Sequence, residues 1–216
     1  QAASAMGCEV LFSGTPEYDI TKQIASFEQD LAKKPKGILL SRAALIQSRQ
    51  LLIDVFGMRQ GEVYGNLSRL HTIGGLRAMC LALLDGIDVR FFEGEARTGI
   101  AYAEAVLTSS VAVALCGASF VRLLAKSAPW LAGRPTKLRA LMSCGSFYDD
   151  DASAKVRKDY GIEVVNAYGQ TETSGIVMCE PLGSYRRDRM APPLPGISQS
   201  FRDAGQGLWE LGIHTP

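Results

Sequence analysis

The stretch VVNAYGQTETSG, residues 164–175, places an aromatic ring, hydroxyl groups and a carboxylate within a few residues of one another. The ring of Tyr168 offers a π face on which a purine base can stack. Thr171 can donate a hydrogen bond to a phosphate oxygen, and Glu172 supplies the carboxylate oxygen that Mg²⁺ prefers. The stretch is therefore a candidate site for a nucleotide and its metal ion, although a Tyr-Gly turn followed by a capping threonine is also common in ordinary loops.

A second group of small and polar residues, Ser-Cys-Gly-Ser at 143–146, lies at the end of the preceding expected strand. Strands are expected at 138–143 and 162–166, with a helix between them. In an open α/β sheet, ligands bind beyond the carboxyl ends of the strands. A flat ligand is therefore expected between Gly145, where no side chain covers the backbone, and the ring of Tyr168.

The elements that must position these residues alternate along the chain, as hydrophobic periodicity indicates. Strands are expected at 7–12, 38–40, 63–70, 87–92, 111–116, 138–143 and 162–166, and helices at 20–32, 41–56, 74–84, 101–107, 118–127 and 150–159. This order predicts an α/β fold with a mostly parallel sheet covered by helices on both faces. We expect a core over 1–180, then an irregular segment and the start of a further β region over 181–216, with an antiparallel strand at 207–213.

The composition excludes several classes of protein. The chain has 216 residues, a formal net charge of +1, 47% hydrophobic and 21% charged residues, which points to neither a nucleic-acid nor a membrane-surface partner. No apolar run reaches the roughly 18 residues of a membrane span. Five cysteines without a CxxC pair suit a reducing, cytoplasmic location. The sequence lacks GxGxxG, GxxxxGK[ST] and GxSxG, which disfavours dinucleotide oxidoreductases, P-loop NTPases and α/β-hydrolases.

The stretch NAYGQTE (166–172) resembles the Asn-x-Tyr-Gly-x-Thr-Glu motif of the adenylate-forming superfamily: acyl-CoA synthetases, luciferases and peptide-synthetase adenylation domains. Four other stretches resemble family motifs in the same order. PKGILLSRAAL (35–45) is similar to the end of the phosphate-binding loop, RLHTIGGL (69–76) to Pro-Leu-Phe-His-x-Gly-Gly-Leu, residues 143–146 to Ser-Gly-Gly-Ala, and PPLPGI (192–197) to Gly-x-Pro-x-Pro-Gly. The resemblance extends from residue 35 over nearly all of the chain and implies the central part of the large N-terminal domain.

The resemblance implies roles for the matching residues. Tyr168 would stack on adenine, Thr171 would contact a phosphate, and Glu172 would hold Mg²⁺. His71 would lie at the mouth of the acyl pocket, where the substrate carboxylate meets the α-phosphate of ATP; from its type alone it would be a core histidine. His71, Thr171 and Glu172 would be the catalytic residues. The other implied nucleotide contacts are Lys36, Gly145, Ser146, Asn166, Ala167, Gly169 and Gln170.

The activity implied by the resemblance is ATP-dependent formation of an acyl-adenylate, followed by transfer of the acyl group to a thiol of coenzyme A or of a carrier protein. Peptide-synthetase adenylation domains place an aspartate near the second motif to pair with the substrate ammonium, whereas residues 66–76 contain no acid. A buried ammonium without a partner is costly. The form of the motifs therefore favours an acyl-CoA synthetase acting on a fatty, aryl or small acid without an α-amino group.

Two departures from the family pattern support an alternative. The residues before Pro35 are FEQDLAKK, where the family has the glycine- and threonine-rich half of the phosphate-binding loop. We expect this loop to be missing from the chain near Ala32 and Lys33. The C-terminal domain with the catalytic lysine is also expected beyond Pro216, so the fragment alone would be inactive. If the protein truly lacks the loop, the alternative is a non-catalytic adenylation fold that binds a ligand or a protein partner.

Overall fold

The computed structural model of the protein describes residues 42–92, 99–184, 191–205 and 208–214. The elements expected at 7–12, 20–32 and 38–40 lie outside these ranges. The same is true of Lys36 and of the expected break between Ala32 and Lys33, so the prediction of a missing loop stays a prediction. Within the described ranges, no helix has the length and apolar character needed to cross a membrane.

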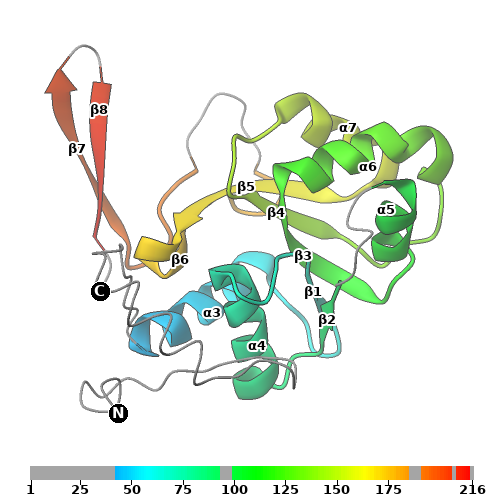
Figure 1. The fold of residues 1–216 in the computed structure, drawn as a ribbon, viewed down its shortest axis with the longest axis horizontal. Coiled ribbons are helices and arrows are strands. Elements are labelled where there is room, and N and C mark those ends of the chain that lie inside the picture. Colours follow the sequence, from blue (N-terminus) through cyan, green and yellow to red (C-terminus); the bar gives the residue numbers. More distant parts are fainter. Residues whose placement is uncertain (1–41, 93–98, 185–190, 206–207, 215–216) are drawn as a thin grey trace, which may run out of the picture. The chain divides into compact units, whose positions relative to one another are not determined.

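A six-stranded sheet forms the centre of the described structure (Figure 1). Its strands are β1 (Val63–Asn66), β2 (Val89–Phe91), β3 (Val111–Gly117), β4 (Ala140–Cys144), β5 (Glu163–Gln170) and β6 (Gly175–Cys179), in the spatial order β2-β1-β3-β4-β5-β6. The first five strands in this order are parallel, and β6 pairs with β5 antiparallel. The predicted mostly parallel α/β sheet is confirmed.

Helices cover both faces of the sheet. The helices are α3 (Arg42–Phe56), α4 (Ile73–Asp85), α5 (Ile100–Leu107), α6 (Ala118–Leu131) and α7 (Asp150–Tyr160). Figure 1 shows α3 and α4 on one side of the sheet and α5, α6 and α7 on the other. Strand β3 contributes side chains to the cores on both faces of the sheet. Val111 and Ala114 pack in the core under α5–α7, whereas Val113 and Leu115 pack in the core under α3 and α4. Burial on both faces explains the unbroken apolar run of β3.

Local capping signals fix the bounds of the helices next to the strand ends. The hydroxyl of Thr72 accepts a hydrogen bond from the N–H of Gly75 at 3.3 Å and starts α4. The carboxylate of Asp149 accepts one from Ala152 N–H at 3.0 Å and starts α7. Gly86 and Gly161, which follow these two helices, take the left-handed conformation with φ of 62° and 67°. Helix α4 therefore begins directly after a turn that leads from β1.

Two expected strand ends differ from the structure by four residues each. Strand β1 ends at Asn66 instead of residue 70, because the side-chain amide of Asn66 donates to Ser68 O at 2.8 Å and turns the chain. Strand β5 continues to Gln170 instead of ending at Asn166. Its extension follows from antiparallel pairing with β6, in which Tyr168 lies opposite Met178 and Gln170 opposite Gly175.

The C-terminal part of the described chain contains a two-stranded antiparallel hairpin, β7 (Ser198–Gly205) and β8 (Leu208–His214). The strand expected at 207–213 is confirmed as β8. Strand β7 lies in the segment 181–206, whose content of Pro, Gly, Arg and Asp predicts irregular structure, so this prediction is wrong over Ser198–Gly205. Antiparallel pairing with β8 makes this segment a strand despite its composition. Ile197, Leu211 and Ile213 pack against Val177 and Met178 of β6.

Candidate functional site

A cavity of about 480 Å³ opens at the carboxyl ends of β3, β4 and β5. Four other segments complete its walls: the loop after β1, the first turn of α4, the start of α6 and the start of β6. The lining residues are Ser68, Arg69, Thr72, Ile73, Gly74, Arg77, Leu115, Cys116, Gly117, Ser119, Cys144, Gly145, Ser146, Gly169, Gln170, Thr171, Gly175 and Ile176. This location matches the expectation that a ligand binds beyond the strand ends.

The end of β4 contributes an open stretch of backbone. Ser143 pairs with Asn166 across β4 and β5, so the two polar strand ends lie side by side, as the sequence predicts. Gly145 has φ +81°, and no atom lies within 4 Å of the position that a Cβ would take. Gly145 and Ser146 both line the cavity. A flat ligand can therefore approach this backbone without meeting a side chain.

The end of β5 contributes the three consecutive residues Gly169, Gln170 and Thr171. The chain then reverses through a 3-10 helix, Thr171–Thr173, into β6. Within this reversal, the hydroxyl of Thr173 accepts from Gln170 N–H at 3.1 Å and lies 2.8 Å from Gly175 O, so it stabilises the turn itself. The side chain of Thr171 is exposed on the cavity wall. Thr171, and not Thr173, is therefore the hydroxyl available to a ligand.

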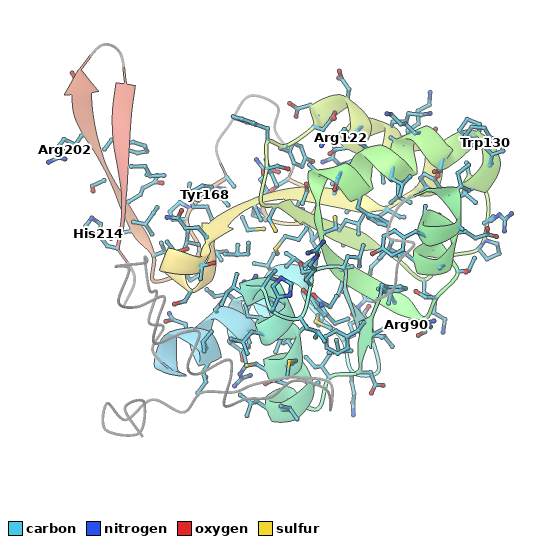
Figure 2. The ribbon with its side chains drawn as sticks, viewed as in Figure 1. Arg90, Arg122, Trp130, Tyr168, Arg202 and His214 are labelled. Atoms are coloured by element: carbon cyan, nitrogen blue, oxygen red, sulfur yellow. The ribbon has the colours of Figure 1, made fainter. Side chains whose placement is uncertain are left out.

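Four other predicted residues, Tyr168, Asn166, Ala167 and His71, are described by the structure and do not line the cavity. The ring of Tyr168 is 41% exposed on β5, next to Gly169 (Figure 2). Asn166 is half-buried, and its backbone N–H donates to Glu180 Oε2 at 3.1 Å, while Ala167 packs in the core under α3 and α4. His71 is exposed in the turn before Thr72. Glu172 belongs to the 3-10 helix. The structure thus gathers Gly145, Ser146, Gly169, Gln170 and Thr171 at one cavity.

Sequence reasoning missed Arg77, which lines the cavity from α4 although its side chain is only 1% exposed. Its Nη1 donates to Ser48 Oγ at 3.3 Å, and its Nε has no hydrogen-bond partner. Burial lowers the pKa of the Arg77 guanidinium below its ordinary value. Helical spacing places Arg77 on the same face of α4 as Gly74, three residues before it, but this spacing alone does not predict that the arginine is buried.

The described side chains that line the cavity give it a positive character. Arg69 and Arg77 contribute cations, and no carboxylate is found among the lining residues that the structure describes. Cys116 and Cys144 are free thiols whose pKa values are raised, mainly by burial, so they stay protonated and neutral near pH 7. A cavity with this charge suits an anionic ligand.

The described residues contain no group of three His, Cys, Asp or Glu side chains that would hold a metal ion by themselves. Mg²⁺ does not require such a cage, because it is usually bound by one or two carboxylates together with water and substrate phosphates. Glu172 follows Thr171 directly in the 3-10 helix, so a carboxylate occurs in the sequence next to the exposed hydroxyl. This donor set fits a magnesium ion that arrives with a phosphate ligand.

Comparisons with known proteins bear on the family and the fold of the chain. The sequence profile described as "AMP-binding enzyme" matches residues 34–208. The fold is similar to a benzoate CoA ligase from Burkholderia xenovorans LB400, with a TM-score of 0.75 and 20% identity over 85% of this chain and 39% of that protein. It is also similar to the o-succinylbenzoate CoA synthetase MenE from Bacillus subtilis, in complex with ATP and magnesium, with a TM-score of 0.66 and 19% identity over 80% of this chain and 36% of MenE.

A third similar structure is the anthranilate CoA ligase AuaEII in complex with anthranoyl-AMP, with a TM-score of 0.68 and 18% identity over 79% of this chain and 33% of that protein. No curated protein sequence matches the chain. The chain spans less than two fifths of the length of each of the three structures. At these identities, the likeness to the three structures is one of fold.

Proposed function

The chain belongs to the family of AMP-binding enzymes, and from this premise we propose that it binds ATP and a carboxylic acid for the formation of an acyl-adenylate. In the proposed reaction, a carboxylate oxygen bonds to the α-phosphorus of ATP and pyrophosphate leaves. A thiol, that of coenzyme A in our proposal, then takes the acyl group and releases AMP. The observation that supports this most directly is the cavity where Gly145, Ser146 and Thr171 meet at the strand ends.

For the nucleotide, we assign adenine stacking to the exposed ring of Tyr168. The open backbone at Gly145 and Ser146, together with the polar edge of Gln170, suits the base and sugar. The hydroxyl of Thr171 would donate to a phosphate oxygen, and Glu172 would hold Mg²⁺. The metal ion, when bound, neutralises charge on the phosphates. Asn166, Ala167, Gly169 and Lys36 complete the proposed nucleotide contacts.

For the acid, the first turn of α4 is the proposed binding element. Thr72, Ile73 and Gly74 line the cavity, so the N-terminal end of a 13-residue helix faces the bound substrate. This end carries partial positive charge and free N–H groups, which favour a carboxylate. His71, one residue before the N-cap Thr72, is the proposed polar contact for the substrate carboxylate at the mouth of the acyl pocket. The absence of a carboxylate among the described lining residues supports an acid without an α-amino group.

Binding and turnover test the proposal separately. Calorimetry should detect ATP binding to the chain in the presence of Mg²⁺, and ATP–pyrophosphate exchange should be measured on the full-length protein with a panel of carboxylic acids. We expect Glu172→Ala to lower exchange at least about a hundredfold, as is typical for losing an electrostatic contact at a reacting phosphate.

A control variant, Glu104→Ala, changes a carboxylate on α5 that pairs with Arg134 and does not line the cavity. Exchange within threefold of wild type in Glu172→Ala would refute the assignment of the metal to that residue. Exchange with proteinogenic amino acids alone would refute the substrate class. ATP binding without exchange for any acid would favour the alternative, a non-catalytic adenylation fold that binds a ligand.

A further inference from the structure

Arg77 is a buried cation without a carboxylate partner among the described residues. Its side chain is 1% exposed, and its only side-chain hydrogen bond within the described ranges joins Nη1 to Ser48 Oγ at 3.3 Å. Its Nε lacks a partner. A guanidinium carries five N–H donors in a planar fork, so most of its capacity for hydrogen bonds is unused here.

The titratable groups near Arg77 do not neutralise it. Tyr64 and Cys144 are the groups that interact with its charge. Burial raises the pKa values of both side chains, so both are neutral near pH 7. The charge of the buried Arg77 guanidinium thus remains uncompensated by these neighbours on the side of the cavity formed by α4.

The surrounding backbone is shaped to accommodate this guanidinium. Gly175, at the start of β6, has φ +123°, and a Cβ there would lie 2.6 Å from Arg77 Nη1 and 2.7 Å from Ser48 Oγ. The glycine leaves the space that the charged end of Arg77 fills. Because Gly175 and Arg77 also line the cavity, the guanidinium lies at the wall of the candidate site and not in a separate core.

We propose that Arg77 recognises a second carboxylate on the substrate, so that the acid activated at this site is a dicarboxylic acid. One carboxylate would react at the nucleotide end, near Gly145 and Thr171, and the other would pair with the guanidinium of Arg77. A planar guanidinium binds a carboxylate through two parallel hydrogen bonds, which gives direction as well as charge. This inference rests on the proposed function, because it names the substrate class of the same cavity.

The test compares matched acids on the full chain by calorimetry, in the presence of ATP and Mg²⁺. Each dicarboxylate (malonate, succinate, glutarate, adipate and phthalate) is paired with the monocarboxylate in which a methyl group replaces one carboxylate. We expect at least one dicarboxylate to bind roughly thirtyfold or more tightly than its partner, the lower end of the effect of a buried charge pair. Arg77→Met should remove this preference, and Arg77→Lys should restore part of it.

Thermal unfolding of the ligand-free protein provides the second readout. Replacement of an unpaired buried cation by an apolar side chain of similar volume removes a desolvation cost. Arg77→Met should therefore melt at the same temperature as wild type or higher, while losing the preference for dicarboxylates. Arg90→Met, which removes an exposed arginine of β2 that stacks on Phe92, should keep the preference.

Three results would overturn the inference. A clearly lower melting temperature for Arg77→Met would mean that a group of the chain itself pairs with Arg77. Equal binding of each dicarboxylate and its matched monocarboxylate would mean that the cavity does not recognise a second carboxylate. The same would follow if no dicarboxylate bound while ATP still did. If the wild-type protein neither bound ATP nor catalysed ATP–pyrophosphate exchange, the proposed function itself would be contradicted. Failure of this inference and failure of the proposed function are therefore distinguishable.

Discussion

Gly169 lies where β5 packs tightly against the start of β6, and Gly169→Ala tests whether this close packing positions the candidate site. A Cβ on residue 169 would lie 2.0 Å from Gly175 O, 2.5 Å from Gly175 C and 2.6 Å from Ile176 Cα. All three atoms belong to the backbone, so no side-chain rotation can relieve the overlap. The two strands must separate by about an ångström or lose their pairing at this end.

The expected cost follows from these contacts. Overpacking in a well-packed region costs about 1–3 kcal/mol. Because the added Cβ would overlap with three backbone atoms, we expect Gly169→Ala to lower the free energy of unfolding by about 3 kcal/mol. For a domain of this size, that corresponds to a fall in melting temperature of roughly 6–12 °C. Since Gly169 is two residues from Thr171, displacement of the strand end should also weaken ATP binding.

Urea and thermal unfolding of the purified chain measure this cost, with Gly117→Ala as the matched control. Gly117 lines the same cavity, has φ −82°, and a Cβ there would meet no atom closer than 3.5 Å. Its alanine variant should lie within about 0.5 kcal/mol of wild type, or be more stable because alanine restricts the unfolded chain. If the free energy of unfolding of Gly169→Ala were as close to that of wild type as the value for Gly117→Ala, the reasoning would be refuted.

Two further predictions concern the elements around the site. Gly75→Ala should cost about 2–3 kcal/mol, because a Cβ would lie 2.4 Å from Arg69 O and 2.5 Å from Leu70 Cα; a melting temperature equal to wild type would contradict the packing of α4 on the preceding turn. The bond from Arg139 to Glu62, at 2.8 Å, lowers the pKa of Glu62 to about 2 from its ordinary 4.5. The pair therefore stabilises the fold above pH 4.5, and this contribution is lost as pH falls from 4.5 towards 2. Urea unfolding of wild type and Glu62→Gln over this interval should converge, and parallel curves would contradict the assignment.

The sequence by itself determined the order of the elements and the side of the sheet where the site lies. The apolar run of β3 and the alternation of strands and helices predict a parallel sheet, because hydrophobic period and connection length are local properties. In such a sheet, Ser143 and Asn166 must end at the same edge, and the register confirms that they are paired. The sequence therefore places the motif NAYGQTE at this edge of the sheet, and its residues Gly169, Gln170 and Thr171 line the cavity there.

The length of β5 depended on tertiary pairing. Asn166 to Gln170 carry turn-forming residues, and local propensity predicts that the strand stops there. Pairing with β6 extends the strand to Gln170, since the antiparallel ladder satisfies backbone groups that a turn would otherwise expose. The same pairing leaves the ring of Tyr168 exposed and Ala167 in the core, which alternation along a strand explains and a loop would not.

Arg77 shows what only the tertiary structure decided. From sequence, an arginine on an amphipathic helix is expected in solvent, because burial of a charge is costly. Its burial results from Ser48 on α3 and Gly175 on β6, which lie 29 residues before it and 98 residues after it in the chain. No local sequence pattern predicts that such distant segments pack against one another. The charge of the cavity therefore became visible only when α3, α4 and β6 were packed together.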